Sequence, residues 1–190
     1  MGKVYVFLAD GFEEIEGLTV VDILRRGEID TCMVSITGKK EIAGSHGIRV
    51  EADALFEETD FSDALMLVLP GGMPGTLHLG EHKGLTSLLQ ETAAAGGRIA
   101  AICAAPTVLG DLGLLEGKRA TCYPGKEDRL RGAECLTDET VVSGNITTSR
   151  GLGTALPFAL KLLELLRGED VSSRIAASVV YCSLSPLSPK

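Results

Sequence analysis

Two hydrophobic patterns alternate along this chain. Short runs of consecutive apolar residues are typical of strands covered on both faces, whereas apolar residues at every third or fourth position are typical of helices with one buried face. The runs predict strands at 4–9, 31–37, 64–69, 119–122, 141–142 and 146–148, and one that ends at Cys103. The spaced pattern predicts helices from 15 to about 26, from 83 to 95, from 106 to about 115, from 151 onward and from 171 to 180. This alternation indicates an α/β domain with a mostly parallel central sheet.

Local signals refine this outline. Glycines flank Ser45-His46 within residues 41–54, which predicts a hairpin with a tight tip. Asp10 with Glu13 three positions later predicts a capping box at the start of the first helix. Ligands of parallel sheets bind beyond the carboxyl ends of the strands, so residues 13–16, the turn at 71–72 and Cys103 are expected on one rim.

Length and charge restrict the class of protein. The chain has 190 residues, 45% of them hydrophobic, which favours one domain over 1–182, followed by a Ser/Pro-rich tail at 183–190 that we expect to be disordered. A net charge of −8 argues against a nucleic-acid partner, because phosphate binding needs a basic face. No charged leader or membrane-length apolar run is found, so a cytoplasmic protein without a membrane partner is expected.

Metal and cofactor chemistry receive little support. The five cysteines are irregularly spaced without a C-x-x-C pair, which favours reduced thiols over disulfides or zinc. His78 and His82 are spaced i, i+4, but Gly80 lies between them, and a solvated loop is the expected setting. The glycine spacing of dinucleotide-binding turns is absent after the first strand. We therefore expect no metal and no cofactor.

Cys103 is the strongest candidate for chemistry. It ends an apolar run and precedes Ala104, Ala105 and Pro106, small residues and a proline that suit a sharp turn into a helix. A strand that turns sharply into a helix at a nucleophile is a nucleophile elbow. Helix-end N–H groups at such a site lower a thiol pKa and favour thiolate. The alternative is a buried, inert cysteine.

Four segments together carry a family resemblance. Taken in chain order they resemble the DJ-1/ThiJ/PfpI superfamily, most closely its DJ-1/YajL-like branch, over nearly the whole chain. The resemblance implies a flavodoxin-like three-layer sandwich, a homodimer, and a reactive cysteine paired with a glutamate. The segments are DGFEEIE at 10–16, LPGG at 69–72, AAICAAP at 100–106 and TSRGLGT at 148–154.

The resemblance also implies roles for individual residues. Cys103 is the implied nucleophile and Glu16 its carboxyl partner. An ionised carboxylate would disfavour a neighbouring thiolate, so Glu16 is expected to hold its proton and donate it to sulfur. Gly71 and Gly72 form either an ordinary tight turn or an oxyanion site, in which the Gly72 and Ala104 N–H groups face a substrate oxygen. Helix-dipole complementarity explains Glu13 and Glu14.

Three positions differ from relatives. Tyr123 stands where many DJ-1 members carry a histidine, and a phenol with a pKa of about 10 is a poor base at neutral pH. Ala104 stands where PfpI-type hydrolases place a histidine after the cysteine, which argues against peptidase activity. His46 corresponds to an arginine that approaches the partner subunit's site in relatives, so it is a candidate substrate contact; a solvent-exposed turn histidine is the alternative.

Two functions follow from the resemblance. The first is a cofactor-independent enzyme for reactive α-oxoaldehydes or their early thiol and amine adducts, of the glyoxalase III or protein deglycase kind, converting methylglyoxal to lactate. The second is an oxidative-stress sensor or redox-regulated chaperone that uses oxidation of Cys103. Both need the same reactive sulfur.

Overall fold

The computed structural model describes residues 2–182, and the predicted tail at 183–190 lies outside the described residues. The strands are β1 (Lys3–Leu8), β2 (Thr31–Ser35), β3 (Glu41–Ala43), β4 (Arg49–Glu51), β5 (Ala54–Leu55), β6 (Ala64–Leu69), β7 (Arg98–Ile102), β8 (Arg119–Ala120), β9 (Glu134–Cys135), β10 (Thr140–Ser143) and β11 (Ile146–Ser149). The α-helices are α1 (Glu14–Arg26), α2 (Gly75–Glu81), α3 (Lys83–Ala94), α4 (Pro106–Asp111), α5 (Ala155–Arg167) and α6 (Glu169–Ser178). Short 3-10 turns are η1 (Phe56–Glu58), η2 (Glu127–Arg129) and η3 (Leu152–Thr154).

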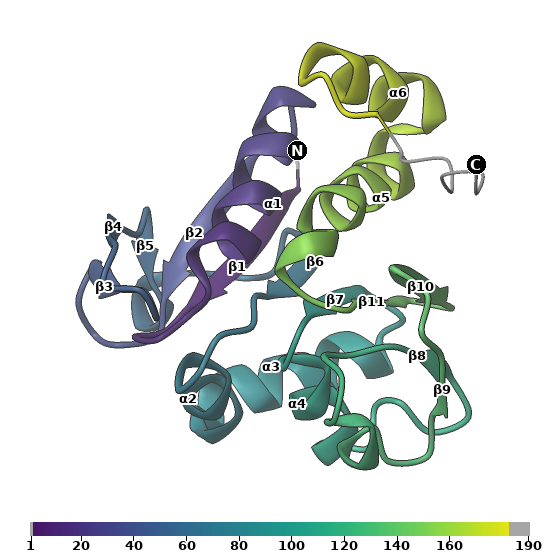
Figure 1. The fold of residues 1–190 in the computed structure, drawn as a ribbon. Coiled ribbons are helices and arrows are strands. Elements are labelled where there is room, and N and C mark those ends of the chain that lie inside the picture. Colours follow the sequence, from purple (N-terminus) through teal and green to yellow (C-terminus); the bar gives the residue numbers. More distant parts are fainter. Residues whose placement is uncertain (1, 183–190) are drawn as a thin grey trace.

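The central sheet has seven strands in the order β10-β11-β7-β6-β1-β2-β5. Every neighbouring pair runs parallel except β10 and β11. Helices α1 and α5 cover one face and α2, α3 and α4 the other (Figure 1). The predicted α/β class and mostly parallel sheet are confirmed.

Alternation along each strand explains the two covered faces. In β1, Val4, Val6 and Leu8 pack with α1 and α5, whereas Tyr5 and Phe7 pack with the opposite layer. All five side chains are buried, so the strand is continuously apolar instead of alternating with polar residues. Burial of each large apolar side chain contributes about 1.5–3 kcal/mol, which holds the strand ends firmly in register.

The structure corrects two helix predictions. Helix α2 was not expected, because its glycines interrupt the apolar spacing, yet Leu79 is fully buried. His78 therefore lies on a helix, and the His82 ring caps α3 by accepting the Leu85 N–H at 3.0 Å, so neither is in a solvated loop. Helix α4 ends at Asp111, short of the predicted 115.

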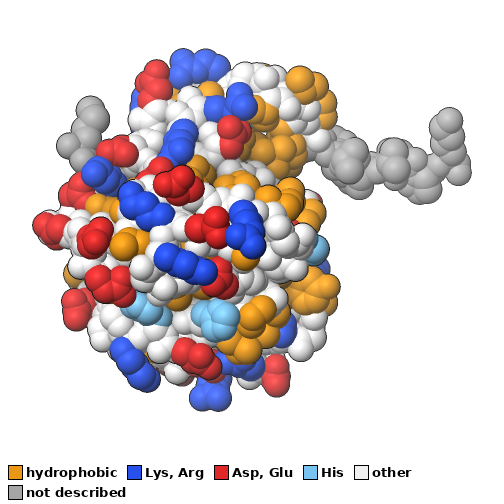
Figure 2. All heavy atoms as spheres, turned by 90° about the vertical axis from the view of Figure 1, so that its left-hand side faces the viewer, with side chains coloured by type: hydrophobic (Ala, Val, Ile, Leu, Met, Phe, Trp, Pro, Cys, Tyr) orange, Lys and Arg blue, Asp and Glu red, His pale blue; other side chains and the backbone are white. Residues whose placement is uncertain are grey.

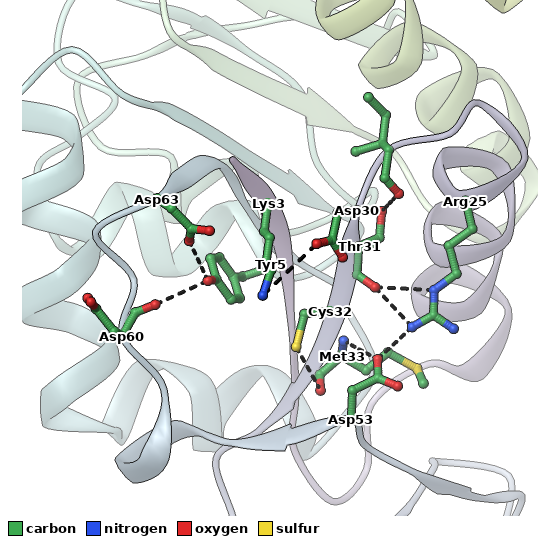
Figure 3. Close-up of polar contacts among 11 residues, drawn as sticks. Lys3, Tyr5, Arg25, Asp30, Thr31, Cys32, Met33, Asp53, Asp60 and Asp63 are labelled. Atoms are coloured by element: carbon green, nitrogen blue, oxygen red, sulfur yellow. Dashed lines mark hydrogen bonds and ion pairs between the residues drawn. The ribbon is translucent and has the colours of Figure 1, made fainter. Parts of the chain in front are cut away.

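A polar cluster fixes the far end of α1. Arg25, in the last helical turn, donates to the Thr31 carbonyl at 2.9 Å and to Asp53 Oδ2 at 2.6 Å (Figure 3). Asp53 Oδ2 also accepts the Met33 N–H at 2.8 Å. These contacts join α1 to β2 and to the segment before β5, and so help to set the position of the helix that carries Glu16.

No helix in the described part of the chain combines the length and apolar character of a membrane span. Figure 2 views the molecule from the side of the β3–β4 hairpin. On this face acidic and basic side chains are intermixed, with small apolar patches between them. This face therefore presents no separate basic field of the kind that nucleic-acid binding requires.

Candidate active site

Three loops meet at the carboxyl ends of neighbouring strands β1, β6 and β7. They bring Glu16, Gly71 and Cys103 together, as the rim argument predicted. A Cβ placed on Gly71 would lie 2.6 Å from Cys103 Cβ, 2.7 Å from Glu16 Oε2 and 3.1 Å from Cys103 Sγ. The sulfur and the carboxyl oxygen thus border the same small space, which glycine leaves open.

Cys103 has the backbone geometry of an elbow. Its φ of 65° lies in the left-handed region, which costs a residue with a side chain about 1–3 kcal/mol. The Cys103 N–H donates to the Ser149 carbonyl at 3.0 Å, and the Tyr123 N–H donates to the Cys103 carbonyl at 2.8 Å. Two hydrogen bonds to neighbouring segments therefore hold the strained residue and aim its side chain across the sheet edge.

Two backbone donors face the sulfur. The N–H groups of Ala104 and Gly72 both form hydrogen bonds that stabilise the Cys103 anion. Within the described residues, neither N–H donates to another backbone carbonyl at the elbow or the turn. These are the two groups predicted for an oxyanion site, so the geometry permits them to receive a negative oxygen or sulfur there.

Glu16 is a buried acid in the first turn of α1, only 1% exposed. Its Oε2 accepts the Gly71 N–H at 2.9 Å. Burial, with a smaller contribution from the charge of Glu13, raises the pKa of Glu16 to about 7, against the opposing effects of Cys103 and the Gly71 N–H. Near neutral pH the carboxyl is therefore poised between donating and accepting a proton.

The expected low thiol pKa is wrong while Glu16 is ionised. Burial, followed by the charge of Glu16 and its hydrogen bond, raises the pKa of Cys103 to about 12, and the N–H groups of Ala104 and Gly72 only partly oppose this. The helix that follows the elbow has six residues, so its dipole contributes little. Above about pH 7 the pair is therefore a thiol beside a carboxylate, and below it both groups hold their protons, as expected for Glu16. Thiolate forms when the thiol proton moves to the Glu16 carboxylate.

Glu13 and Glu14 have more specific roles than dipole complementarity. Glu13, not Asp10, is the N-cap of α1, and its Oε2 accepts the Glu16 N–H at 2.7 Å. Asp10 Oδ1 instead accepts the Ala43 N–H at 2.9 Å. The sequence contains a second pair of acidic residues spaced i, i+3, namely Glu13 and Glu16, which begins three positions after the Asp10–Glu13 pair. This second pair marks the true start of the helix.

His46 lies at the hairpin tip, against Glu14. Its Nδ1 is 2.8 Å from Glu14 Oε2, and its N–H donates to Glu14 Oε1 at 2.8 Å. Burial raises the pKa of Glu14, but hydrogen bonds from His46, from the Ile48 N–H and from its own backbone outweigh this and lower it to about 2. The side chain of His46 is 67% exposed. The structure therefore groups His46 with Glu14 and not with Cys103, and its contact with a partner's substrate stays a prediction.

Tyr123 lies at the border of the candidate active site. The Tyr123 ring is 3.4 Å from the Cβ position of Gly151, which lies 3.9 Å from Glu16 Oε1, so the half-exposed ring borders the site.

Ligand atoms of Glu13, Glu14 and His46 lie within 4.8 Å of one another, a spacing that a metal could use. The Glu14 oxygens already accept hydrogen bonds from the hairpin tip, which accounts for this cluster without a metal.

The sequence as a whole matches a known family. A model of the DJ-1/PfpI family matches residues 2–165. The chain belongs to the DJ-1/PfpI family. Protein dj-1beta of Drosophila melanogaster is 37% identical over 177 residues, covering 92% of this chain and 95% of the relative. The chain spans only 41% of Protein DJ-1 homolog B of Arabidopsis thaliana, to which it is 36% identical over 180 residues, 94% of its own length.

Two further DJ-1 relatives bear on fold and chemistry. The structure of oxidized Toxoplasma gondii DJ-1 superposes with a TM-score of 0.92 at 35% identity, covering 96% of this chain and all of that one. This confirms the flavodoxin-like sandwich. Glutathione-independent glyoxalase DJR-1.2 of Caenorhabditis elegans is 33% identical over 165 residues, covering 86% of this chain and 87% of the relative.

Replacing Gly71 with alanine should disrupt the DJ-1 site. The added methyl would lie within 2.7 Å of both Cys103 and Glu16, so we expect a loss of about 1–3 kcal/mol in unfolding free energy and slower alkylation of Cys103 by iodoacetamide. Gly153→Ala is the matched control, because its Cβ would meet no atom within 4 Å. Equal behaviour of the two variants in urea denaturation and alkylation would show that the space at Gly71 is not needed.

Glu16→Gln should stabilise the protein at alkaline pH. The raised pKa means that stability from the protonated carboxyl is fully present below pH 4.5 and is lost as pH rises through about 7. Glutamine stays neutral and retains an oxygen for the Gly71 N–H, so the variant should gain up to about 3 kcal/mol at pH 8 and almost nothing near pH 4.5. Urea denaturation at both pH values measures this; a gain independent of pH would contradict a titrating Glu16.

Proposed function

We propose that this DJ-1/PfpI protein is a cofactor-independent cysteine enzyme acting on reactive α-oxoaldehydes, with methylglyoxal as the simplest substrate and lactate as the product. The observation that carries the proposal is the position of the Glu16 carboxyl and the Cys103 sulfur around Gly71, next to the backbone N–H groups of Gly72 and Ala104. The glutathione-independent glyoxalase of C. elegans, 33% identical, supports the reaction class. The more specific form of the proposal is a deglycase, whose substrates are the early thiol and amine adducts of the same aldehydes.

The first step joins sulfur to the aldehyde carbon. Glu16 takes the proton from the Cys103 thiol as the sulfur electron pair attacks C1, and the electrons of the carbonyl π bond move to oxygen. The N–H groups of Gly72 and Ala104 stabilise the negative oxygen, an effect worth about 3–4 kcal/mol for one such donor in other enzymes. Glu16 then returns the proton to that oxygen, which gives a neutral hemithioacetal.

The second step moves hydrogen from C1 to C2. Glu16 removes the proton from C1, the ketone oxygen is protonated from solvent, and an enediol forms. Reprotonation at C2 by Glu16, with loss of the C1 hydroxyl proton, gives a lactoyl thioester of Cys103. Water adds to the thioester carbonyl, the C–S bond breaks, and lactate and the free thiol are released. No electron acceptor is needed, because one carbon is oxidised as its neighbour is reduced.

The same geometry makes peptidase chemistry a poor alternative. Cysteine peptidases use a histidine to activate sulfur and to protonate the leaving amine. In this chain Ala104 follows the nucleophile, and the group coupled to sulfur is Glu16. Tyr123, where relatives carry a histidine, borders the site as a half-exposed phenol.

Purified protein should convert methylglyoxal to lactate without glutathione. We expect Cys103→Ser to abolish the activity and Glu16→Gln to lower kcat/KM by about 10²–10⁴-fold, because each removes a group that handles the transferred proton or forms the covalent bond. The value of kcat/KM in the parent should fall as pH drops below about 7, where Glu16 becomes protonated and no base remains. Proton NMR in D₂O measures the lactate and the deuterium that enters at C2 from solvent exchange.

Cys135→Ser is the matched control for the nucleophile. Cys135 is an exposed thiol at the end of β9, which pairs with β8 in a separate two-stranded sheet, so its replacement should leave the activity unchanged. A Cys103→Ser protein as active as the parent would eliminate the scheme. Deuterium at C2 would exclude a direct hydride shift from C1 to C2.

The redox function stays the alternative prediction. The named activity of the C. elegans relative favours the aldehyde reaction over a sensor or chaperone without a dedicated substrate. In the redox scheme peroxide would convert Cys103 to a sulfinic acid next to Glu16. Homodimer formation and a cytoplasmic location also stay predictions; light scattering on the purified chain would decide the first.

A further inference from the structure

Glu13 forms hydrogen bonds with Glu16 and with Gly71, two of the three residues that meet at the candidate active site. As the N-cap of α1 it accepts the Glu16 N–H through Oε2 at 2.7 Å. Its own N–H donates to the Gly71 carbonyl at 2.9 Å. The Gly71 N–H in turn donates to Glu16 Oε2 at 2.9 Å. Glu13, Gly71 and Glu16 therefore form a closed ring of hydrogen bonds that fixes where the Glu16 carboxyl sits.

The Glu13 carboxylate is poorly screened by solvent, because the residue is only 8% exposed. A like charge in such a place disfavours ionisation of a neighbouring carboxyl. The charge of Glu13 acts on Glu16 in this direction and reinforces the larger effect of burial on its pKa.

The other charged or titratable neighbours act differently. Cys103 and the Gly71 N–H favour ionised Glu16. Glu14 is turned to the hairpin tip, where it binds His46. His46 Nδ1 is 3.9 Å from Glu13 Oε1, and when protonated it partly offsets the Glu13 charge. In the loop next to Tyr123, Arg150 Nη1 donates to the Thr137 carbonyl at 3.1 Å.

We infer that Glu13 is a positioning residue of the proposed reaction: its buried carboxylate orients Glu16 through the helix N-cap and strengthens Glu16 as a base. The inference rests on the proposed function, because it assumes that Glu16 accepts the thiol proton. A base is most effective when its pKa lies near the working pH. Without the charge of Glu13, Glu16 would be ionised over a wider pH range but would accept the proton less readily.

Glu13→Gln tests the charge with little change in shape. The glutamine oxygen can still accept the Glu16 N–H, so the helix should form as in the parent. We expect the Glu16 titration midpoint to fall by about one pH unit, with the acid limb of kcat/KM shifted by the same amount and a lower plateau above pH 8. Carbon-13 NMR of δ-carbon-labelled glutamate follows the midpoint directly, and Glu16→Gln assigns the signal.

Two further variants separate charge from structure. Glu14→Gln changes the net charge equally, but at a carboxylate turned to His46, and it should leave the Glu16 midpoint where the parent has it. Glu13→Asp retains the charge with a shorter reach, so it should stay closer to the parent midpoint than Glu13→Gln even if the cap weakens. Circular dichroism confirms that each variant is folded before the titration is compared.

An unchanged Glu16 midpoint in Glu13→Gln would overturn the inference, as would equal shifts in Glu13→Gln and Glu14→Gln. The failure of the proposed function has a different signature. If the parent makes no lactate from methylglyoxal, the reaction is wrong, yet the NMR midpoint still shows whether Glu13 controls the protonation of Glu16.

Discussion

The site depends on the close approach that Gly71 permits between a helix and an elbow. Strand β6 ends between β1 and β7, so the turn after it lies between Glu16 on one side and Cys103 on the other. A side chain at residue 71 would occupy the space where the sulfur and the carboxyl meet. The next residue, Gly72, has a φ of 93°, and a Cβ there would lie 2.2 Å from the Glu13 nitrogen. Two consecutive glycines are thus needed for two different contacts.

Apolar burial on both faces of the central sheet offsets two locally unfavourable features of the site. A left-handed Cys103 and a buried, ionisable Glu16 each cost free energy where they stand. Cys103 directly follows β7 and Glu16 lies in the first turn of α1, beside strands whose side chains alternate between two apolar layers. The large apolar burial in those layers offsets the local costs.

Prediction from the sequence was accurate where a single hydrophobic or topological pattern decides the structure. Strands β1, β2, β6 and β7 of the central sheet follow from continuous apolar runs, whereas β5 was not predicted and the predicted strand at 119–122 is β8 in a separate sheet. The meeting of Glu16, Gly71 and Cys103 follows from parallel strand topology. It failed where several short-range interactions compete. Helix α2 is short and glycine-rich, and the choice between Asp10 and Glu13 as N-cap depends on one turn of register. The position of His46 depends on a buried Glu14 that local sequence does not reveal as its partner.

The sequence pattern of a nucleophile elbow does not by itself determine whether the Cys103 sulfur is protonated. Helix-end amides favour a thiolate, but their effect competes with desolvation and with Glu16 at the same small space. Moving the thiol proton to Glu16 keeps a single negative charge on the pair, so the repulsion between a thiolate and a carboxylate never arises. The fold therefore need not stabilise a free thiolate against solvent. It needs only to let the thiol proton pass to Glu16 as the sulfur attacks, and the same carboxyl can then carry a proton between two substrate carbons.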